Sequence, residues 1–149
     1  MKQSINQDFF LNYALWLARN LLVKILVRKI NGQEIKASIV ETEAYMGATD
    51  DRAAHSYGFK RTARTETLYR PGGTIYLYLI IFISLYGIYY CLNIVASSQD
   101  DPQAVLIRGV ELLEGHEIAR NYLAANNRNK GPENWTNGPG KLTLALNLD

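Results

Sequence analysis

The sequence contains a single cysteine, Cys91, and only two histidines, His55 and His116, among its 149 residues. One cysteine excludes an intrachain disulfide framework, and without a Cys-x-x-Cys pair the usual sequence evidence for a zinc or iron–sulfur site is absent. The two histidines lie far apart, and neither has a ligand partner at helical spacing. We therefore expect no metal and a reducing compartment.

No charged side chain occurs between Pro71 and Gln99, a stretch that centres on TIYLYLIIFISLYGIYYCLNIV. Its length alone is compatible with a membrane span. However, polar tips of tyrosines and of Asn93 are scattered through it, and β-branched and aromatic residues dominate it, which favours buried strands. Cys91 lies in this run and is expected to be an inert core thiol. The first residues also lack the pattern of a secretory signal, so we predict an intracellular protein without a membrane segment.

The length suits one domain, and 48% hydrophobic with 20% charged residues is close to the globular average. Apolar residues recur at helical spacing over residues 8–22, with Asn6 or Asp8 available as the cap, and predict an amphipathic first helix. Two strand-like runs then surround Asn31-Gly32, the dipeptide that best supplies a two-residue hairpin turn.

If the second of these runs is an unbroken strand, its two-residue period places one row of side chains on a single face. The row consists of Ile35, Ala37, Ile39, Glu41, Glu43 and Tyr45. Two carboxylates then continue an apolar row, which is unfavourable unless they reach solvent, a partner or a substrate cleft. We therefore expect the strand to leave the core near Glu41, either into a pocket or as a solvated strand end.

Residues 46–73 predict a long connection, after which the uncharged stretch supplies one or more strands. The segment AVLIRGVELLEG predicts another strand that ends near Glu111, and residues 116–127 predict a helix. The segment NKGPENWTNGPG predicts a loop because it is rich in Gly, Pro and Asn, and KLTLALNL begins a last helix. No internal repeat is present.

The positive charge of the chain is local, although its formal net charge is only +2. Residues 52–70 contain five basic side chains and one acid, and residues 120–141 contain four basic side chains and one acid. These two segments suit a face that meets a polyanion, with a solvated loop as the alternative. Gly and Pro before Lys141, at a helix start, could also hold one backbone phosphate.

Six segments in order closely resemble the 3-methyladenine DNA glycosylases of the alkyladenine, or methylpurine, type. They are IVETEAYMG, DRAAHS, RPGGTIYLY, YGIYYCLNI, VLIRGVELLEG and NGPGKL, and the resemblance runs from about Leu11 to Leu146. It implies hydrolysis of the bond between a damaged purine and deoxyribose, which leaves an abasic site. The expected partner is double-stranded DNA that contains damaged purines.

The resemblance also implies a role for each matching residue. Glu43 matches the acid that activates the attacking water, and Arg108 matches a basic residue that helps hold the acid and the water. The pocket for the flipped base is matched by Tyr45, His55 and Tyr78, with Asn93 at its floor, where it disfavours the exocyclic amine of guanine. A carboxylate at Glu43 can stabilise the positive charge that develops on the sugar and can take a proton from water, so no cofactor is required.

Two features depart from the family pattern. About five residues, IFISL, are added between Tyr78 and Tyr86. The resemblance matches Tyr86 to the residue that wedges into the minor groove. The insertion changes the spacing before Tyr86 and Asn93, and an odd number of added residues reverses the face to which later side chains of a strand point, unless a bulge or a longer hairpin absorbs it. Family members also continue beyond the GPGKL helix, so the domain over residues 1–149 is expected to lack the C-terminal part of the family.

Together these features predict an α/β protein of the α+β type, a single domain with a curved antiparallel sheet flanked by helices. We predict a monofunctional DNA glycosylase, since no motif for an amine nucleophile is present, with a catalytically impaired DNA-binding homologue as the alternative. Arg61, Arg64 and Lys141 are expected to contact DNA phosphates. The protein is expected to be a monomer in the cytoplasm, associated with the nucleoid, or in the nucleus of a eukaryotic cell.

Overall fold

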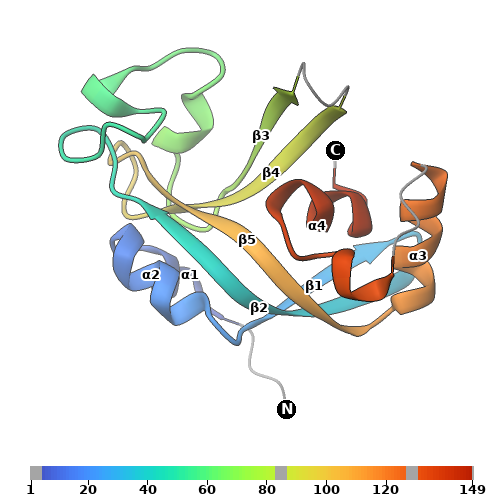
Figure 1. The fold of residues 1–149 in the computed structure, drawn as a ribbon. Coiled ribbons are helices and arrows are strands. Elements are labelled where there is room, and N and C mark those ends of the chain that lie inside the picture. The colour runs from blue at the N-terminus through green and yellow to red at the C-terminus, as the bar shows by residue number, and fades with distance from the viewer. Residues whose placement is uncertain (1–4, 83–86, 127–130, 149) are drawn as a thin grey trace. The chain divides into compact units, whose positions relative to one another are not determined.

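The computed structural model describes residues 5–82, 87–126 and 131–148 (Figure 1). Its strands are β1 (Ile25–Ile30), β2 (Gln33–Tyr45), β3 (Ile75–Phe82), β4 (Gly87–Ala96) and β5 (Gln103–Glu114). Its longer helices are α1 (Gln7–Phe10), α2 (Ala14–Leu21), α3 (His116–Ala125) and α4 (Pro139–Ala145). Over these residues the strands form one open antiparallel sheet, in the order β1-β2-β5-β4-β3, flanked by helices. The predicted α/β class and antiparallel sheet are confirmed.

The chain divides into two compact units that share the strands of the sheet. The first unit contains Met1–Asn20, Glu43–Tyr76 and Asn93–Leu106. The second unit contains Leu21–Thr42, Leu77–Leu92 and Ile107–Asp149. Because each unit combines segments that are distant in sequence, neither corresponds to a continuous stretch of chain. The contacts described below lie within one unit or the other.

The N-terminal segment forms two helices, α1 and α2, where the sequence predicts one. Asn6 caps α1 as expected, because its Oδ1 accepts a hydrogen bond from the Phe9 amide at 3.3 Å. The helix then stops because the amide of Ser97, at the end of β4, donates to the carbonyls of Phe10 and Asn12 at 3.1 and 2.9 Å. These tertiary hydrogen bonds replace the intrahelical ones that a continuous helix would need.

The predicted hairpin is confirmed between β1 and β2. The two strands pair antiparallel with Ile30 opposite Gln33, so the turn holds only Asn31 and Gly32. Both turn residues have positive φ angles, 50° and 76°, which is the requirement of the tight turn that matches the twist of paired strands. The register places Ile25 opposite Ser38 at the far end of the pair.

Within the described residues, the uncharged stretch forms β3 and β4, as its scattered polar tips and its β-branched and aromatic residues predict. Tyr76, Cys91 and Asn93 are buried there, with 5%, 5% and 7% of their surfaces exposed. Among the described residues, no helix is both long and apolar enough to cross a membrane. The expected burial of the Cys91 thiol is confirmed, and burial also raises the pKa of this thiol.

The C-terminal elements follow the predicted order with shifted boundaries. β5 continues to Glu114, three residues beyond the predicted end at Glu111. Gly115 then turns the chain into α3 with a φ of 86°, and a Cβ at this position would lie 2.8 Å from the carbonyl oxygen of Glu34. α4 begins at Pro139, earlier than KLTLALNL suggests, because proline is well suited to the first turn of a helix.

Candidate functional site

The row of side chains on β2 starts in the core, continues with two carboxylates and ends at Tyr45. Ile35, Ala37 and Ile39 have at most 2% of their surfaces exposed, whereas 58% of the Glu41 side chain is exposed. Glu43, two residues further along, is partly buried. The prediction that this strand leaves the core near Glu41 is therefore confirmed. The alternation of a strand places Glu43 on the same face as Glu41, and its charge is not completely buried.

Glu41 forms an ion pair with Arg108 of β5 within the second unit. The Nε atom of Arg108 donates to Oε1 of Glu41 at 3.0 Å, and 40% of the Arg108 side chain is exposed. A Cβ on Gly109 would make ordinary van der Waals contacts with this carboxylate, 3.5 and 3.6 Å from Cβ and Oε2 of Glu41, so the ion pair does not require glycine there. The role implied for Arg108, to help hold the acid matched by Glu43, stays a prediction. The partner, Glu41, is the other acid of the β2 row.

His55 lies in the connection after β2, close to Tyr76 of β3. Its Nδ1 is 3.5 Å from the Tyr76 hydroxyl, and the two rings meet edge to face with centroids 6.3 Å apart. Partial burial of the ring lowers the pKa of His55, and the positive charge of Arg64 lowers it further. The imidazole is therefore neutral at pH 7, with one nitrogen that donates a hydrogen bond and one that accepts.

Asn93 lies on β4, where it pairs with Leu106 of β5, and it is 7% exposed. Its Nδ2 donates to the backbone carbonyl of Tyr76 at 3.3 Å. This bond orients the side-chain amide, because the nitrogen end must face the Tyr76 carbonyl. Tyr76 therefore contacts two residues predicted for the base pocket, through its hydroxyl and through its carbonyl.

The three tyrosines of the predicted site have different placements. Tyr45 is the last residue of β2, and Tyr78 lies on β3; both are partly buried. Tyr86, the predicted wedge, lies outside the described residues. Tyr45 belongs to the first unit together with Glu43, His55 and Asn93, whereas Tyr78 belongs to the second unit together with Arg108.

Arg61, predicted to contact phosphate, is held by two acids of the first unit. Its Nε and one terminal nitrogen donate to Glu66 at 2.8 and 2.7 Å, and its other terminal nitrogen donates to Asp100 at 3.1 Å. The guanidinium also lies 4.6 Å from the centre of the Tyr69 ring. Hydrogen bonding to Arg61 lowers the pKa of Glu66, so this carboxylate remains charged.

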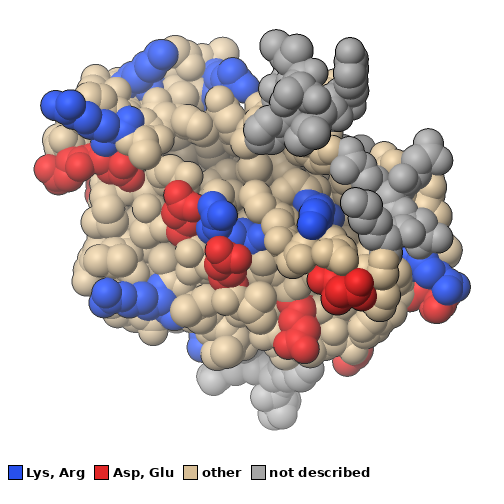
Figure 2. Space-filling model, viewed as in Figure 1, with Lys and Arg blue, Asp and Glu red and all other residues tan. Residues whose placement is uncertain are grey.

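The other two predicted phosphate contacts are exposed. Arg64 lies in a turn over residues 63–65, and Lys141 lies in the first half of α4. The Nζ atom of Lys141 donates to Oδ1 of Asn137 at 2.8 Å. On the face of the molecule in Figure 2, basic and acidic side chains lie next to one another. In the basic segments, Arg61 and Arg120 pair with acids.

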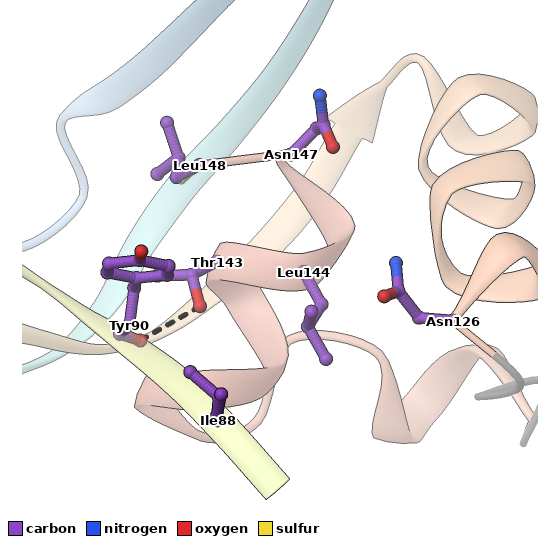
Figure 3. Close-up of a pocket in the computed structure, with 7 residues that line it drawn as sticks. All are labelled: Ile88, Tyr90, Asn126, Thr143, Leu144, Asn147 and Leu148. Carbon is purple, nitrogen blue, oxygen red and sulfur yellow. Dashed lines mark hydrogen bonds between the residues drawn. The ribbon is translucent and has the colours of Figure 1, made fainter. Parts of the chain in front are cut away.

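A cavity of about 210 Å³ lies in the second unit, beside α4 (Figure 3). It is lined by Ile88, Tyr90, Asn126, Thr143, Leu144, Asn147 and Leu148. Thr143 closes one side, where its hydroxyl donates to the Tyr90 carbonyl at 2.9 Å. None of the residues predicted for the catalytic or base-binding site lines this cavity, and no pattern in the sequence predicts it.

The chemistry open to the described residues is acid–base chemistry. Cys91 is buried with a raised pKa, so its thiol is not an activated nucleophile. No group of three or more His, Cys, Asp or Glu side chains within residues 5–82, 87–126 and 131–148 could hold a metal ion. What the structure offers is a partly buried carboxylate, an acid–guanidinium pair and a neutral imidazole beside tyrosines.

Two functional contacts were missed from the sequence. The pairing of Glu41 with Arg108 joins residues 67 positions apart, and the bond from Asn93 to Tyr76 joins residues 17 positions apart. The first requires knowledge that β2 lies beside β5, which no local pattern gives. The second could have been found, because Tyr76 and Asn93 lie on consecutive strands whose pairing the uncharged run suggests.

Comparison with known proteins gives one consistent result. The family model for methylpurine-DNA glycosylase (MPG) matches residues 8–149. A protein of Clostridium perfringens (strain SM101) named "Putative 3-methyladenine DNA glycosylase" is 47% identical over 151 residues, which cover 97% of this chain and 70% of the relative. Proteins of the same name from Borrelia garinii and Natranaerobius thermophilus are 48% and 43% identical, over 97% of this chain and 68% and 69% of their own lengths.

Proposed function

This chain belongs to the methylpurine-DNA glycosylase family, and from that premise we propose that it removes alkylated or deaminated purines from double-stranded DNA at the bacterial nucleoid. Membership of the family supports a glycosylase activity on DNA in general. The proposal adds that the damaged purine is flipped out of the duplex, that its N-glycosidic bond is hydrolysed, and that an intact strand with an abasic site remains.

Glu43 is the proposed catalytic acid. Departure of a damaged purine leaves positive charge on the deoxyribose, and a nearby carboxylate both stabilises that charge and accepts a proton from the attacking water. The observation that carries the proposal is the position of Glu43 on β2, where it is partly buried although Glu41, two residues earlier in the same row, is exposed. Partial burial strengthens the electrostatic effect of a carboxylate relative to one in bulk water.

The flipped base is proposed to lie against Tyr45, Tyr78 and His55. Aromatic faces hold a flat purine by stacking, and they favour alkylated purines further because these bases are often cationic. A neutral His55 supports this role, because a protonated imidazole would repel a cationic base. Asn93, oriented by the Tyr76 carbonyl, is proposed to disfavour the exocyclic amine of guanine.

Arg108 is proposed to help hold the acid and the attacking water, and its ion pair with Glu41 supports this role by orienting the guanidinium. Arg61, Arg64 and Lys141 are proposed to contact DNA phosphates, which position the enzyme without reading sequence. The three bonds that Arg61 makes to Glu66 and Asp100 use three of its five N–H groups.

The test is the release of a damaged base from duplex oligonucleotides that carry a single hypoxanthine or ethenoadenine. After incubation with the protein, hot alkali cleaves the strand at any abasic site, and the product is resolved on a denaturing gel. Glu43→Gln is expected to lower the rate of excision by about 10²- to 10⁴-fold, the range for loss of a general base. Binding of the same duplex should remain.

The matched control is Glu34→Gln, the same chemical change on the same strand. Glu34 is exposed and pairs with Lys29 at 3.1 Å, so its substitution should leave excision unchanged. Equal excision by wild type and Glu43→Gln would remove Glu43 from its proposed role. A folded wild-type protein that binds the duplex without releasing either base would instead support a catalytically impaired DNA-binding homologue.

A further inference from the structure

Three flat side chains are exposed within five residues of the connection after β2. His55, Tyr57 and Phe59 all reach solvent, with 42% of Tyr57 and 60% of Phe59 exposed. Single exposed hydrophobic residues are common on protein surfaces, but a phenyl ring that is largely in water adds little to the core. The backbone conformation at Phe59 is also unfavourable for any residue that has a side chain.

Phe59 has a φ of 57°, in the left-handed region, directly after Gly58 with a φ of 71°. For a residue with a Cβ, this conformation brings the side chain too close to the backbone, and bulky residues rarely adopt it. Glycine would adopt it without this penalty. Folding alone therefore favours glycine at position 59, and the exposed phenyl ring does not offset the strain through burial.

The turn that presents Phe59 is firmly anchored to the first unit. Ser56 is 1% exposed, and its hydroxyl donates to the Pro102 carbonyl at 2.9 Å. The Gly58 amide donates to the Ala48 carbonyl at 2.8 Å, and the Lys60 amide donates to the Ser56 carbonyl at 3.2 Å. These bonds hold the backbone on both sides of Phe59, so the ring extends from a defined position.

The surroundings of the turn are suited to a polyanion. Lys60 follows Phe59 directly and is exposed, and the charge of Arg64 is close enough to lower the pKa of His55. Two acids of the first unit, Glu66 and Asp100, are paired with Arg61. Exposed rings interleaved with positive charge are typical of surfaces on which nucleobases stack while phosphates contact cations.

We propose that the turn Ser56–Lys60 is part of the DNA-binding surface and that Phe59 stacks on a nucleobase of the bound duplex. The inference rests on the proposed function for its ligand, and it adds a base contact on the same connection as His55. Lys60 contributes the adjacent phosphate contact. Phe59 is thus a binding residue whose ring strengthens DNA affinity at some cost to the stability of its own turn.

The test combines affinity and stability for Phe59→Gly. Binding is measured by fluorescence anisotropy with a labelled duplex that carries a tetrahydrofuran analogue of an abasic site, which cannot be turned over. We expect affinity to fall about tenfold, within the range for one aromatic–base stack. The thermal midpoint should stay the same or rise, because glycine relieves the left-handed strain. A surface residue without a DNA contact would show the same stability change and no loss of affinity.

Two further variants separate stacking from general apolar contact. Phe59→Trp should restore most of the affinity because it keeps a flat ring, whereas Phe59→Leu should not. Tyr13→Ala is the matched control, since Tyr13 is an aromatic of the first unit that is 52% exposed outside the basic segments. Its affinity for the duplex should equal that of wild type.

The outcomes also distinguish this inference from the proposed function. If wild type binds the duplex and releases damaged purines while Phe59→Gly binds equally well, the role of Phe59 is wrong and the glycosylase proposal stands. If wild type releases bases, and DNA affinity is highest for wild type and falls through Phe59→Trp and Phe59→Leu to Phe59→Gly, the stacking role is supported. If wild type neither binds nor cleaves, both proposals fail.

Discussion

His55 shows how the surroundings of one side chain affect the whole protein through pH. Partial burial of its ring, and then the charge of Arg64, lower its pKa from 6.5 in the folded chain. Between the lowered value and 6.5, the unfolded chain binds more protons than the folded chain, so stability rises with pH across this window. As the pH falls through the window, this contribution to stability is lost.

The corresponding prediction concerns the thermal midpoint of His55→Gln. From about pH 7 down to about pH 5, the midpoint of this variant should fall less steeply than that of wild type, because the titrating imidazole is gone. The effect should be small because the ring is partly exposed. Arg64→Gln should lie between the two profiles, since it removes only the second cause. Identical slopes for wild type and His55→Gln would contradict the lowered pKa.

At the scale of elements, the β1–β2 hairpin allows conformational strain to be measured without any steric clash. A Cβ on Gly32 would meet no atom within 4 Å, so only the φ of 76° opposes a larger residue. Gly32→Ala should therefore lower the free energy of unfolding by about 1 kcal/mol. Gln33→Ala, an exposed change at the next position, should stay within about 0.5 kcal/mol. Chemical denaturation of the three proteins provides the comparison.

The same hairpin shows which elements could be predicted from the sequence. Its turn dipeptide and the alternation along β2 are local signals, and both the turn and the emergence of β2 at Glu41 are as predicted. The prediction of one continuous first helix was wrong, because the carbonyls of Phe10 and Asn12 accept hydrogen bonds from the Ser97 amide. That bond depends on a strand about 85 residues further along, which helical periodicity cannot reveal.

At the scale of the molecule, the family could be predicted from the sequence, but the contacts of the candidate site could not. Glu43, His55 and Asn93 were predicted because six segments resemble one family; the family assignment is confirmed, and the roles of these residues stay predictions. The ion pair of Glu41 with Arg108 depends on which strands lie side by side, so it could not be read from local pattern. The strained, exposed Phe59 was also missed, since φ angles of isolated residues leave no periodic signal.

Charge distribution leads to the last prediction, the salt dependence of DNA affinity. The net charge of +2 is too small to drive strong binding by itself, so affinity must come from local cations that displace counterions from phosphates. Each phosphate contact contributes about 0.9 to the slope of log affinity against log salt concentration.

Arg64→Gln and Lys141→Gln should each reduce the magnitude of this slope by about that amount, equally for damaged and undamaged duplexes. Lys29→Gln, which removes a cation paired with Glu34 at 3.1 Å outside both basic segments, should leave the slope unchanged. If Lys29→Gln reduced the slope as much as Arg64→Gln, binding would depend on overall charge rather than on the proposed contacts.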